Sequence, residues 1–519
     1  MKMKYIYNKI IVFFVAVALL AACTKNFTDI NTDPNNIPAA LPQQLLAPAL
    51  VNSLTFNMLR NRNFNNELMQ VTVNQSDADG QVFRYDYNST WSDYLYNGLY
   101  SELTNFKDIY KLASDTTSSN FNKSYMGISL ICQSWLYSIL TDTYGDIPYT
   151  ESNLGKDSSI YESKFDKQKD IYLDIFTKLE LANTLLSANT TITASSDPVY
   201  AGNISKWRKF GNSLYLRLLL RVSGKSEVSS VTIAKIKDII DVNAATYPIM
   251  ASNDESAILK WTGVAPYTSP YIAVREQDFR APGIATFFIQ NLVNWNDPRI
   301  DIPTYGTSGF NRWGIAPYQG AYLGINSGYA AGDPTAIKKS YFYSNTSAVS
   351  LQTEPLTGML MNYAELKFIL AEAAARGWIT TGTAATYYTD GALNSITLWL
   401  PLWPTIVNSQ TGQLNNINTF LIAADIQWND NAVLDDKLER IHLQKYYALF
   451  LADMQQWFEY RRTGHPKLPK GAGLKNGGVM PTRMVYPVYV QSSNPTNYQL
   501  AVTGQGADIV STQVWWQKP

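Results

Sequence analysis

The sequence predicts a mainly α-helical protein in which tetratricopeptide-like helical hairpins pack against a loop-rich, irregular subdomain. Apolar residues recur at helical spacing over residues 43–245 and again over 358–460, as in helices that bury one face. Helical periodicity lapses over residues 246–357, where Gly, Pro, Asn and aromatic residues accumulate, and residues 461–519 are loop-rich as well. We therefore expect a single body, residues 43–519, with a helical framework and a loop-rich part.

The N-terminus has the pattern of an export signal. Three lysines precede an apolar run that ends at Ala22, and this run is shorter than the roughly 20 residues that a bilayer span needs. A pair of small residues stands directly before Cys23, which resembles a bacterial lipoprotein signal. We expect residues 1–22 to be removed, Cys23 to be lipidated and residues 23–42 to form a polar tether. An ordinary cleaved signal with an incidental cysteine is the alternative.

Charge and cysteine content exclude two classes. Removing residues 1–22 takes away three lysines and no acid, so 42 basic against 42 acidic residues become 39 against 42. A nearly neutral surface argues against nucleic-acid binding, which needs a basic face. Cys132 has no partner once Cys23 is acylated, so we expect no disulfide framework. Since Cys132 lies in an apolar helical stripe, we interpret it as a buried structural thiol.

The first helices follow from apolar spacing and from their end signals. Apolar residues from Ile128 to Ile139 fall at i, i+3, i+4, i+7, i+8 and i+11, and the Gly145 to Pro148 turn ends this helix. Ser205 is the expected N-cap of a helix that carries Arg217 and Arg221 one turn apart. Paired arginines could hold an anion, but we favour a role in bracing neighbouring helices. The expected helices of this half are 45–73, 91–110, one around 128–139, 165–186, 205–222 and 228–242.

Helical spacing returns after the loop-rich segment. Residues 362–378 carry leucine, isoleucine and alanine on one face and end at Gly377, which is suited to a helix C-terminus. We expect a partner helix over 383–400 and one continuous helix over 438–460. The alternation of helix and turn is typical of tetratricopeptide-type hairpins, although no clean repeat of about 34 residues is present.

Several strings in order along the chain resemble the SusD/RagB family of Bacteroidetes outer-membrane nutrient-binding lipoproteins. They are the cysteine followed by FTDINTDPNN, then SWLYSILTDTYGDIPYTES, KWRKFGNSLYLRLLLR, NDPR at 296–299, MNYAELKFILAEAAARGW, YYTDG at 387–391 and QKYYALFLADMQQWFEYRRTGHP. The resemblance implies a SusD-like fold of about four tetratricopeptide-like units with the ligand site in the loop-rich subdomain. It also implies a lipid-anchored protein at the cell surface that passes ligand to a SusC-like TonB-dependent β-barrel transporter in the outer membrane. Ligands in the family are mostly glycans, with oligopeptides in the RagB branch.

Aromatic residues of the loop-rich segment are the candidate ligand contacts. An aromatic face covers the apolar side of a sugar ring while nearby polar groups satisfy its hydroxyls. We expect Trp313, Tyr318 and Tyr322 to contact the ligand first, and Tyr267 and Tyr271 second. The alternative for each is packing of the loop onto the helices. Under the first reading, Trp313→Ala weakens binding without changing the thermal midpoint, whereas a large loss of stability would place Trp313 in the core.

We expect no enzyme activity, no cofactor and no metal. The two histidines, His442 and His465, are not at the spacing of a zinc-binding helix, and no nucleophile or phosphate-binding motif is present. Asp77 and Asp79 lack the spacing of a calcium loop and read as solvated turn residues. Capture of a glycan is the leading function, capture of an oligopeptide is the alternative, and a surface glycoside hydrolase is a distant third.

Overall fold

The computed structural model describes residues 40–300, 311–408 and 411–518, and residues Pro42–Pro519 form one compact unit. The expected signal peptide and Cys23 lie outside the described residues. Within those residues, no helix is both long enough and apolar enough to cross a bilayer.

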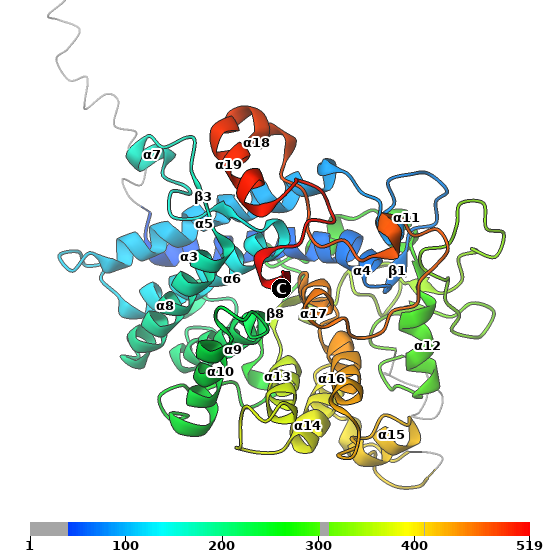
Figure 1. The fold of residues 1–519 in the computed structure, drawn as a ribbon. Coiled ribbons are helices and arrows are strands. Elements are labelled where there is room, and N and C mark those ends of the chain that lie inside the picture. Colours follow the sequence, from blue (N-terminus) through cyan, green and yellow to red (C-terminus); the bar gives the residue numbers. More distant parts are fainter. Residues whose placement is uncertain (1–39, 301–310, 409–410, 519) are drawn as a thin grey trace, which may run out of the picture. The chain divides into compact units, whose positions relative to one another are not determined.

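Successive helices of the N-terminal half pack side by side. They are α3 (Pro42–Arg60), α5 (Ser92–Ser114), α6 (Lys123–Tyr144), α8 (Gln168–Ser187), α9 (Ile204–Val222) and α10 (Ser229–Lys237). In Figure 1, α5 lies against α3 and α6, α6 packs on α8, and α8 on α9. This arrangement confirms the predicted mainly helical architecture.

Local capping explains where these helices begin and end. The Asn122 side chain accepts hydrogen bonds from the backbone N–H groups of Ser124 and Tyr125, and Gly145, with a φ of 86°, ends α6. The N-cap of α9 is Asn203, whose side chain accepts from the N–H of Lys206. Ser205, the N-cap that the sequence predicts, lies inside the helix. Asparagine and serine are both good N-caps, so composition alone did not separate them.

The second helical set is α13 (Tyr363–Ala375), α14 (Ala384–Thr397), α16 (Leu434–Ala448) and α17 (Gln455–Thr463). The prediction of one helix over 438–460 is wrong, because Leu451 and Asp453 have positive φ angles of 74° and 35° between α16 and α17. Left-handed backbone interrupts an α-helix. The apolar spacing continues across the break because both helices face the same core.

Shorter helices lie in the connections and in the loop-rich part. They are α4 (Asn66–Leu68), α7 (Gly155–Ser158), α11 (Glu276–Arg280), α12 (Thr286–Asn294), α15 (Ile417–Ala423), α18 (Val488–Ser493) and α19 (Pro495–Gln505), with the π-helical turns η1 (Asn61–Asn65) and η5 (Asp238–Val242). The C-terminal segment therefore holds two helices that its sequence pattern did not predict.

Four short antiparallel ladders tie distant segments together. They pair β1 (Thr72–Val73) with β5 (Gly283–Ile284), β2 (Ile147–Pro148) with β3 (Phe165–Asp166), β4 (Ala257–Leu259) with β8 (Gly358–Met361), and β6 (Ile315–Ala316) with β7 (Tyr341–Phe342). The β4–β8 ladder is the base of the loop-rich segment, because the chain leaves the helical framework after β4 and returns through β8. Asn362, directly after β8, caps α13 by accepting from the N–H of Glu365.

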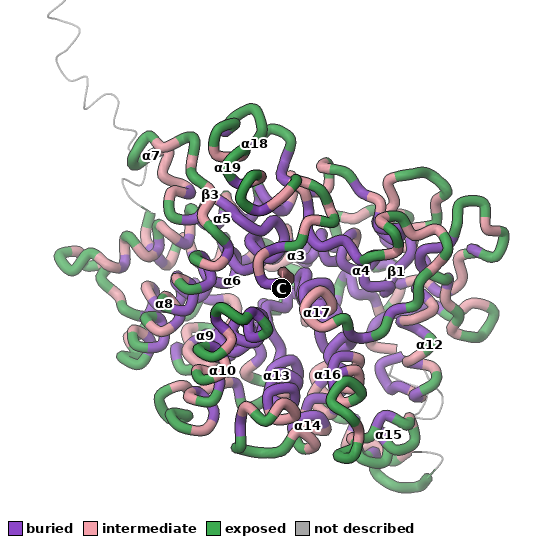
Figure 2. Tube along the Cα trace, viewed as in Figure 1, coloured by how far each residue is buried: buried purple, intermediate pink, exposed green. Residues whose placement is uncertain are grey.

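Buried charge links the two helical sets. The guanidinium group of Arg217 donates from Nε and Nη2 to the two carboxylate oxygens of Glu365, both at 2.6 Å. Arg221 donates to the side-chain oxygen of Gln455 at 2.6 Å, and its Nη1 lies 3.3 Å from Glu459. These contacts confirm that the two arginines brace neighbouring helices. Figure 2 shows α6 and α13 buried along much of their length, and Cys132 in α6 is buried as predicted.

Candidate functional site

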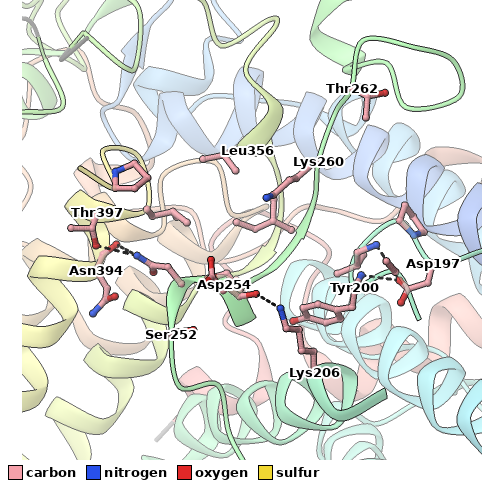
Figure 3. Close-up of a pocket in the computed structure, with 18 of the residues that line it drawn as sticks. Asp197, Tyr200, Lys206, Ser252, Asp254, Lys260, Thr262, Leu356, Asn394 and Thr397 are labelled. Carbon is pink, nitrogen blue, oxygen red and sulfur yellow. Dashed lines mark hydrogen bonds between the residues drawn. The ribbon is translucent and has the colours of Figure 1, made fainter. Parts of the chain in front are cut away.

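A groove of about 970 Å³ lies beside the β4–β8 ladder. One side is the chain that leads into the first turn of α9, from Asp197 to Lys206. The other side is the end of α14, from Asn394 to Pro401. The extended chain around β4 runs between them, as Figure 3 shows. We call this feature the ladder groove.

The α9 side of the ladder groove is rigid. The carboxylate of Asp197 accepts hydrogen bonds from three backbone N–H groups and from the indole nitrogen of Trp207, which lies 2.8 Å away. Tyr200 donates from its hydroxyl to the carbonyl oxygen of Glu255 at 2.8 Å. Burial, together with the carboxylates of Asp197 and Glu255, holds the pKa of Tyr200 well above its usual value. Tyr200 is therefore a neutral wall residue, and Asp197 has little capacity left for a ligand.

A side-chain bridge closes the α14 side. Asn253 donates from Nδ2 to the carbonyl oxygen of Asn394 and to the hydroxyl of Thr397, both at 3.1 Å. Lys206 donates from Nζ to the carbonyl oxygen of Asp254 at 2.8 Å across the middle of the groove. Figure 3 shows both links. The three walls are thus held together without a ligand.

The groove also offers polar groups that the protein does not use. Lys260 and the carboxylate of Asp254 are exposed and make no hydrogen bond or ion pair within the described part of the chain. Leu356, Leu398 and Tyr267 add apolar surface. This mixture of fixed polar groups and apolar surface is typical of small-ligand sites. It lacks the two free carboxylates that glycoside hydrolysis uses, since Asp197 is already engaged along this wall.

Tyr267 is the one predicted aromatic contact that lines the ladder groove. It lies half-buried at the end of a tight hairpin, where its N–H donates to the carbonyl oxygen of Val264 at 2.8 Å. The N–H of Thr262 donates back to the carbonyl oxygen of Tyr267 at 3.0 Å. The hairpin therefore fixes Tyr267 at the edge of the groove.

Trp313 and Tyr271 lie in the core instead. The Trp313 ring is 0 % exposed and lies 5.0 Å from the ring of Phe450, with the guanidinium of Arg299 4.9 Å from its centre. Tyr271 is 1 % exposed and donates to the carbonyl oxygen of Met58 at 3.2 Å. Burial raises the pKa of Tyr271. Neither ring presents a face to solvent, which favours the alternative that these two residues pack the loop onto the helices.

Tyr318 and Tyr322 lie together in another place. Tyr318 exchanges backbone hydrogen bonds with Ala321 across a tight turn, at 2.8 and 3.1 Å. Both tyrosines are half-buried, and Tyr322 packs against the hydrophobic core. Neither lines the ladder groove. Their predicted contact with ligand stays a prediction.

One buried cluster has the residue types of a metal site. Ligand atoms of Glu372, His442 and Glu459 lie within 4.8 Å of one another. Arg462 Nη2 is, however, 2.6 Å from Glu372 and 2.9 Å from Glu459, and Lys445 Nζ is 2.7 Å from Glu459. Although burial opposes ionisation, Arg462 holds the pKa of both carboxyl groups well below its usual value. Because the side chains of Arg462 and Lys445 already pair with these carboxylates, we infer that the cluster holds α13, α16 and α17 together.

Sequence reasoning missed most of the groove. Lys206, Lys260 and Asn394 come from three segments that periodicity does not connect. Lys260 directly follows β4, whose pairing with β8 joins segments about 100 residues apart. A pairing of three residues leaves no clear sequence signal. Of the five aromatic residues that the sequence predicts as ligand contacts, Tyr267 lines the ladder groove.

Known proteins with the same overall fold cover most of this chain. Residues 34–487 match the model of a SusD-like family described as starch-binding and associating with the outer membrane. A SusD homologue from Bacteroides fragilis is 25 % identical, with 92 % of this chain and 99 % of that chain covered and a TM-score of 0.72. A SusD homologue from Bacteroides uniformis is 23 % identical, with the same coverage and TM-score. A chitin-binding SusD homologue from Flavobacterium johnsoniae is 20 % identical, with 92 % and 98 % covered and a TM-score of 0.73. The curated proteins that were compared gave no match.

Proposed function

The chain belongs to the SusD-like family, and from that premise we propose that it is a nutrient-binding lipoprotein that captures an oligosaccharide or polysaccharide at the bacterial surface. The observation that carries the proposal is the family match over residues 34–487, which spans the helical framework and most of the loop-rich part. The solved relatives support the same class of ligand, since one of them binds chitin.

The ladder groove is the proposed capture site. Tyr267 supplies an aromatic ring for the apolar side of a sugar, while Lys260, Asp254 and the polar end of α14 offer partners for hydroxyl groups. The walls are already linked by hydrogen bonds in the absence of ligand. A preformed site loses less entropy on binding than a flexible one.

Glycan and peptide arrays probed with residues 24–519 test this proposal. We expect retention on one class of glycan, and Tyr267→Ala should weaken it by about tenfold, the value of one lost aromatic contact. Gln499→Ala, an exposed amide on α19, is the matched control and should bind normally. Retention on peptides alone would favour an oligopeptide-binding protein of the RagB type. Release of shortened glycans would instead indicate a hydrolase.

We further propose that Cys23 carries the lipid anchor and that the protein delivers its ligand to a SusC-like TonB-dependent barrel. The apolar run before Cys23 and the family membership support this proposal. Mild detergent extraction of the native protein, followed by mass spectrometry of what co-purifies, tests it. Recovery without any β-barrel transporter would contradict the partnership and leave glycan capture standing.

A further inference from the structure

A second hollow, of about 410 Å³, lies within the loop-rich part between α12, the loop around Asn326 and the chain from Pro469 to Gly471. The residues that line it include Gln70, Phe287, Gln290, Asn291, Asn326 and Lys470. We call this the amide pocket. None of its lining residues belongs to the ladder groove. Its volume falls in the range of small-ligand pockets.

The walls of the amide pocket are locked by close backbone approaches. A Cβ atom on Gly324 would lie 2.3 Å from the Cα of Thr286 in α12, and one on Gly471 would lie 2.2 Å from the carbonyl oxygen of Gly328. The N–H of Thr286 donates to the carbonyl oxygen of Ile325 at 2.9 Å. Only glycine allows approaches this close. The shape of the pocket is therefore fixed before any ligand enters.

Part of its polar lining is unused, although Gln70 already donates from its amide nitrogen to the carbonyl oxygen of Pro469 at 2.7 Å. Asn326 and Lys470 are exposed and make no side-chain hydrogen bond or ion pair with other described residues, and Gln290 uses its amide nitrogen on Asn294 at 2.7 Å, which leaves its carbonyl oxygen available. The amide nitrogen of Asn291 is shielded from solvent and faces the phenol oxygen of Tyr447, so we do not count it among the groups available to a ligand. Tyr447 donates its own hydroxyl hydrogen to the carbonyl oxygen of Phe288 at 2.9 Å, and its oxygen can still accept from Asn291.

The pocket therefore offers both donors and acceptors beside one aromatic ring. Phe287 is half-buried, with its ring held edge-on to Tyr446 at 5.5 Å between centres. A sugar hydroxyl both donates and accepts, so it suits a wall of amides better than a purely anionic or cationic ligand does. The Phe287 ring suits the apolar side of the same sugar.

We propose that the amide pocket is a second saccharide-binding site, which holds a short neutral segment of the glycan separately from the ladder groove. This inference rests on the proposed glycan-binding function. Two sites on one rigid body would bind a polysaccharide more tightly than either alone, because the second contact becomes intramolecular.

Calorimetric titration of residues 24–519 with maltohexaose, cellohexaose and chitohexaose tests the inference. The double variant Gln290→Ala/Asn326→Ala removes two exposed amides of the pocket, so its thermal midpoint should stay at the wild-type value. Loss of two hydrogen bonds should weaken binding of at least one probe about tenfold or more. Gln499→Ala should bind as the wild type does, and Tyr267→Ala should retain the component that the double variant loses. A crystal soaked in the bound probe should show a sugar ring against Phe287.

The outcomes separate the two proposals. If the double variant binds every probe with wild-type affinity while Tyr267→Ala binds more weakly, the proposal for the amide pocket is wrong. The proposal for the ladder groove then stands. If the double variant loses binding and Tyr267→Ala does not, the amide pocket stands as a binding site and the ladder groove does not. Binding to none of the probes would overturn the amide pocket as a site for neutral glycans, while arrays with other glycan classes would still decide the proposed function.

Discussion

Trp313 could contact a ligand or pack the loop onto the helices, and its complete burial favours packing. Its ring contacts Phe288, Trp399 and Phe450 at centre distances of 5.7, 6.0 and 5.0 Å. The sequence could show that Trp313 lies in a long loop, but not that the loop folds back over α12 and the end of α16. Aromatic content alone therefore does not separate ligand contacts from core residues, because the same rings supply the core.

Trp313→Ala should destabilise the fold. Removing a fully buried tryptophan leaves a cavity and costs about 3–5 kcal/mol of the free energy of unfolding. Urea unfolding measures the change, with Tyr318→Ala as control, since Tyr318 is half-buried at a turn and should cost under about 1 kcal/mol. If Trp313→Ala leaves stability unchanged and weakens glycan binding, Trp313 contacts the ligand and does not belong to the core.

Glu67 should make stability depend on pH. Burial raises the pKa of its carboxyl group to about 8, although the N–H of Phe83 and the charge of Arg62 act in the opposite direction. The folded state thus favours the protonated form, and stability should fall as pH rises from the ordinary carboxyl pKa toward about 8. Glu67→Gln keeps the shape and cannot ionise. Its stability relative to wild type should increase over that interval by roughly 4–5 kcal/mol.

Thermal or urea unfolding of wild type and Glu67→Gln across this interval gives the comparison. Equal slopes of stability against pH in the two proteins would show that Glu67 ionises normally in the fold.

At the scale of elements, the helices could be predicted and their joints could not. The apolar stripe from Ile128 to Ile139 was sufficient to predict α6, because a helix with a buried face has regularly spaced apolar residues. The break between α16 and α17 depends on backbone angles at Leu451 and Asp453, which apolar spacing does not report. The β4–β8 ladder is equally hidden, and it positions Lys260 in the ladder groove. The framework was therefore visible in the sequence, whereas the groove depends on contacts between distant segments.

The Arg217–Glu365 pair, which joins α9 to α13, should show strong coupling. Both side chains are about 1 % exposed, so removing one partner leaves a buried charge unpaired, at a cost of about 3–5 kcal/mol. Glu365→Leu should therefore be strongly destabilising, whereas Arg217→Met/Glu365→Leu should recover much of the loss. A double-mutant cycle in urea measures this coupling. Additive losses in the double variant would mean that the pair does not act as a unit.

At the scale of the whole molecule, the two proposed sites lie in the same compact unit, Pro42–Pro519. The ladder groove is linked by side-chain hydrogen bonds, and the amide pocket by close glycine contacts. Neither needs a large movement to accept a ligand, so we expect capture to be governed by the number of sugar contacts. Position in the cell is a separate matter, because the residues that would set it lie in the N-terminal segment.

Cys23→Ser should release the protein from the membrane without unfolding it. A lipidated cysteine carries several acyl chains, and more than one chain is needed for stable anchoring. The described hydrophobic core lies within Pro42–Pro519, and we expect the thermal midpoint of the variant to equal that of the native protein. Cell fractionation with an antibody to the body measures the distribution, and Cys132→Ser is the matched control, which should stay with the membrane. Membrane retention of Cys23→Ser in cells without any β-barrel partner would show that something other than an acyl anchor holds the protein there.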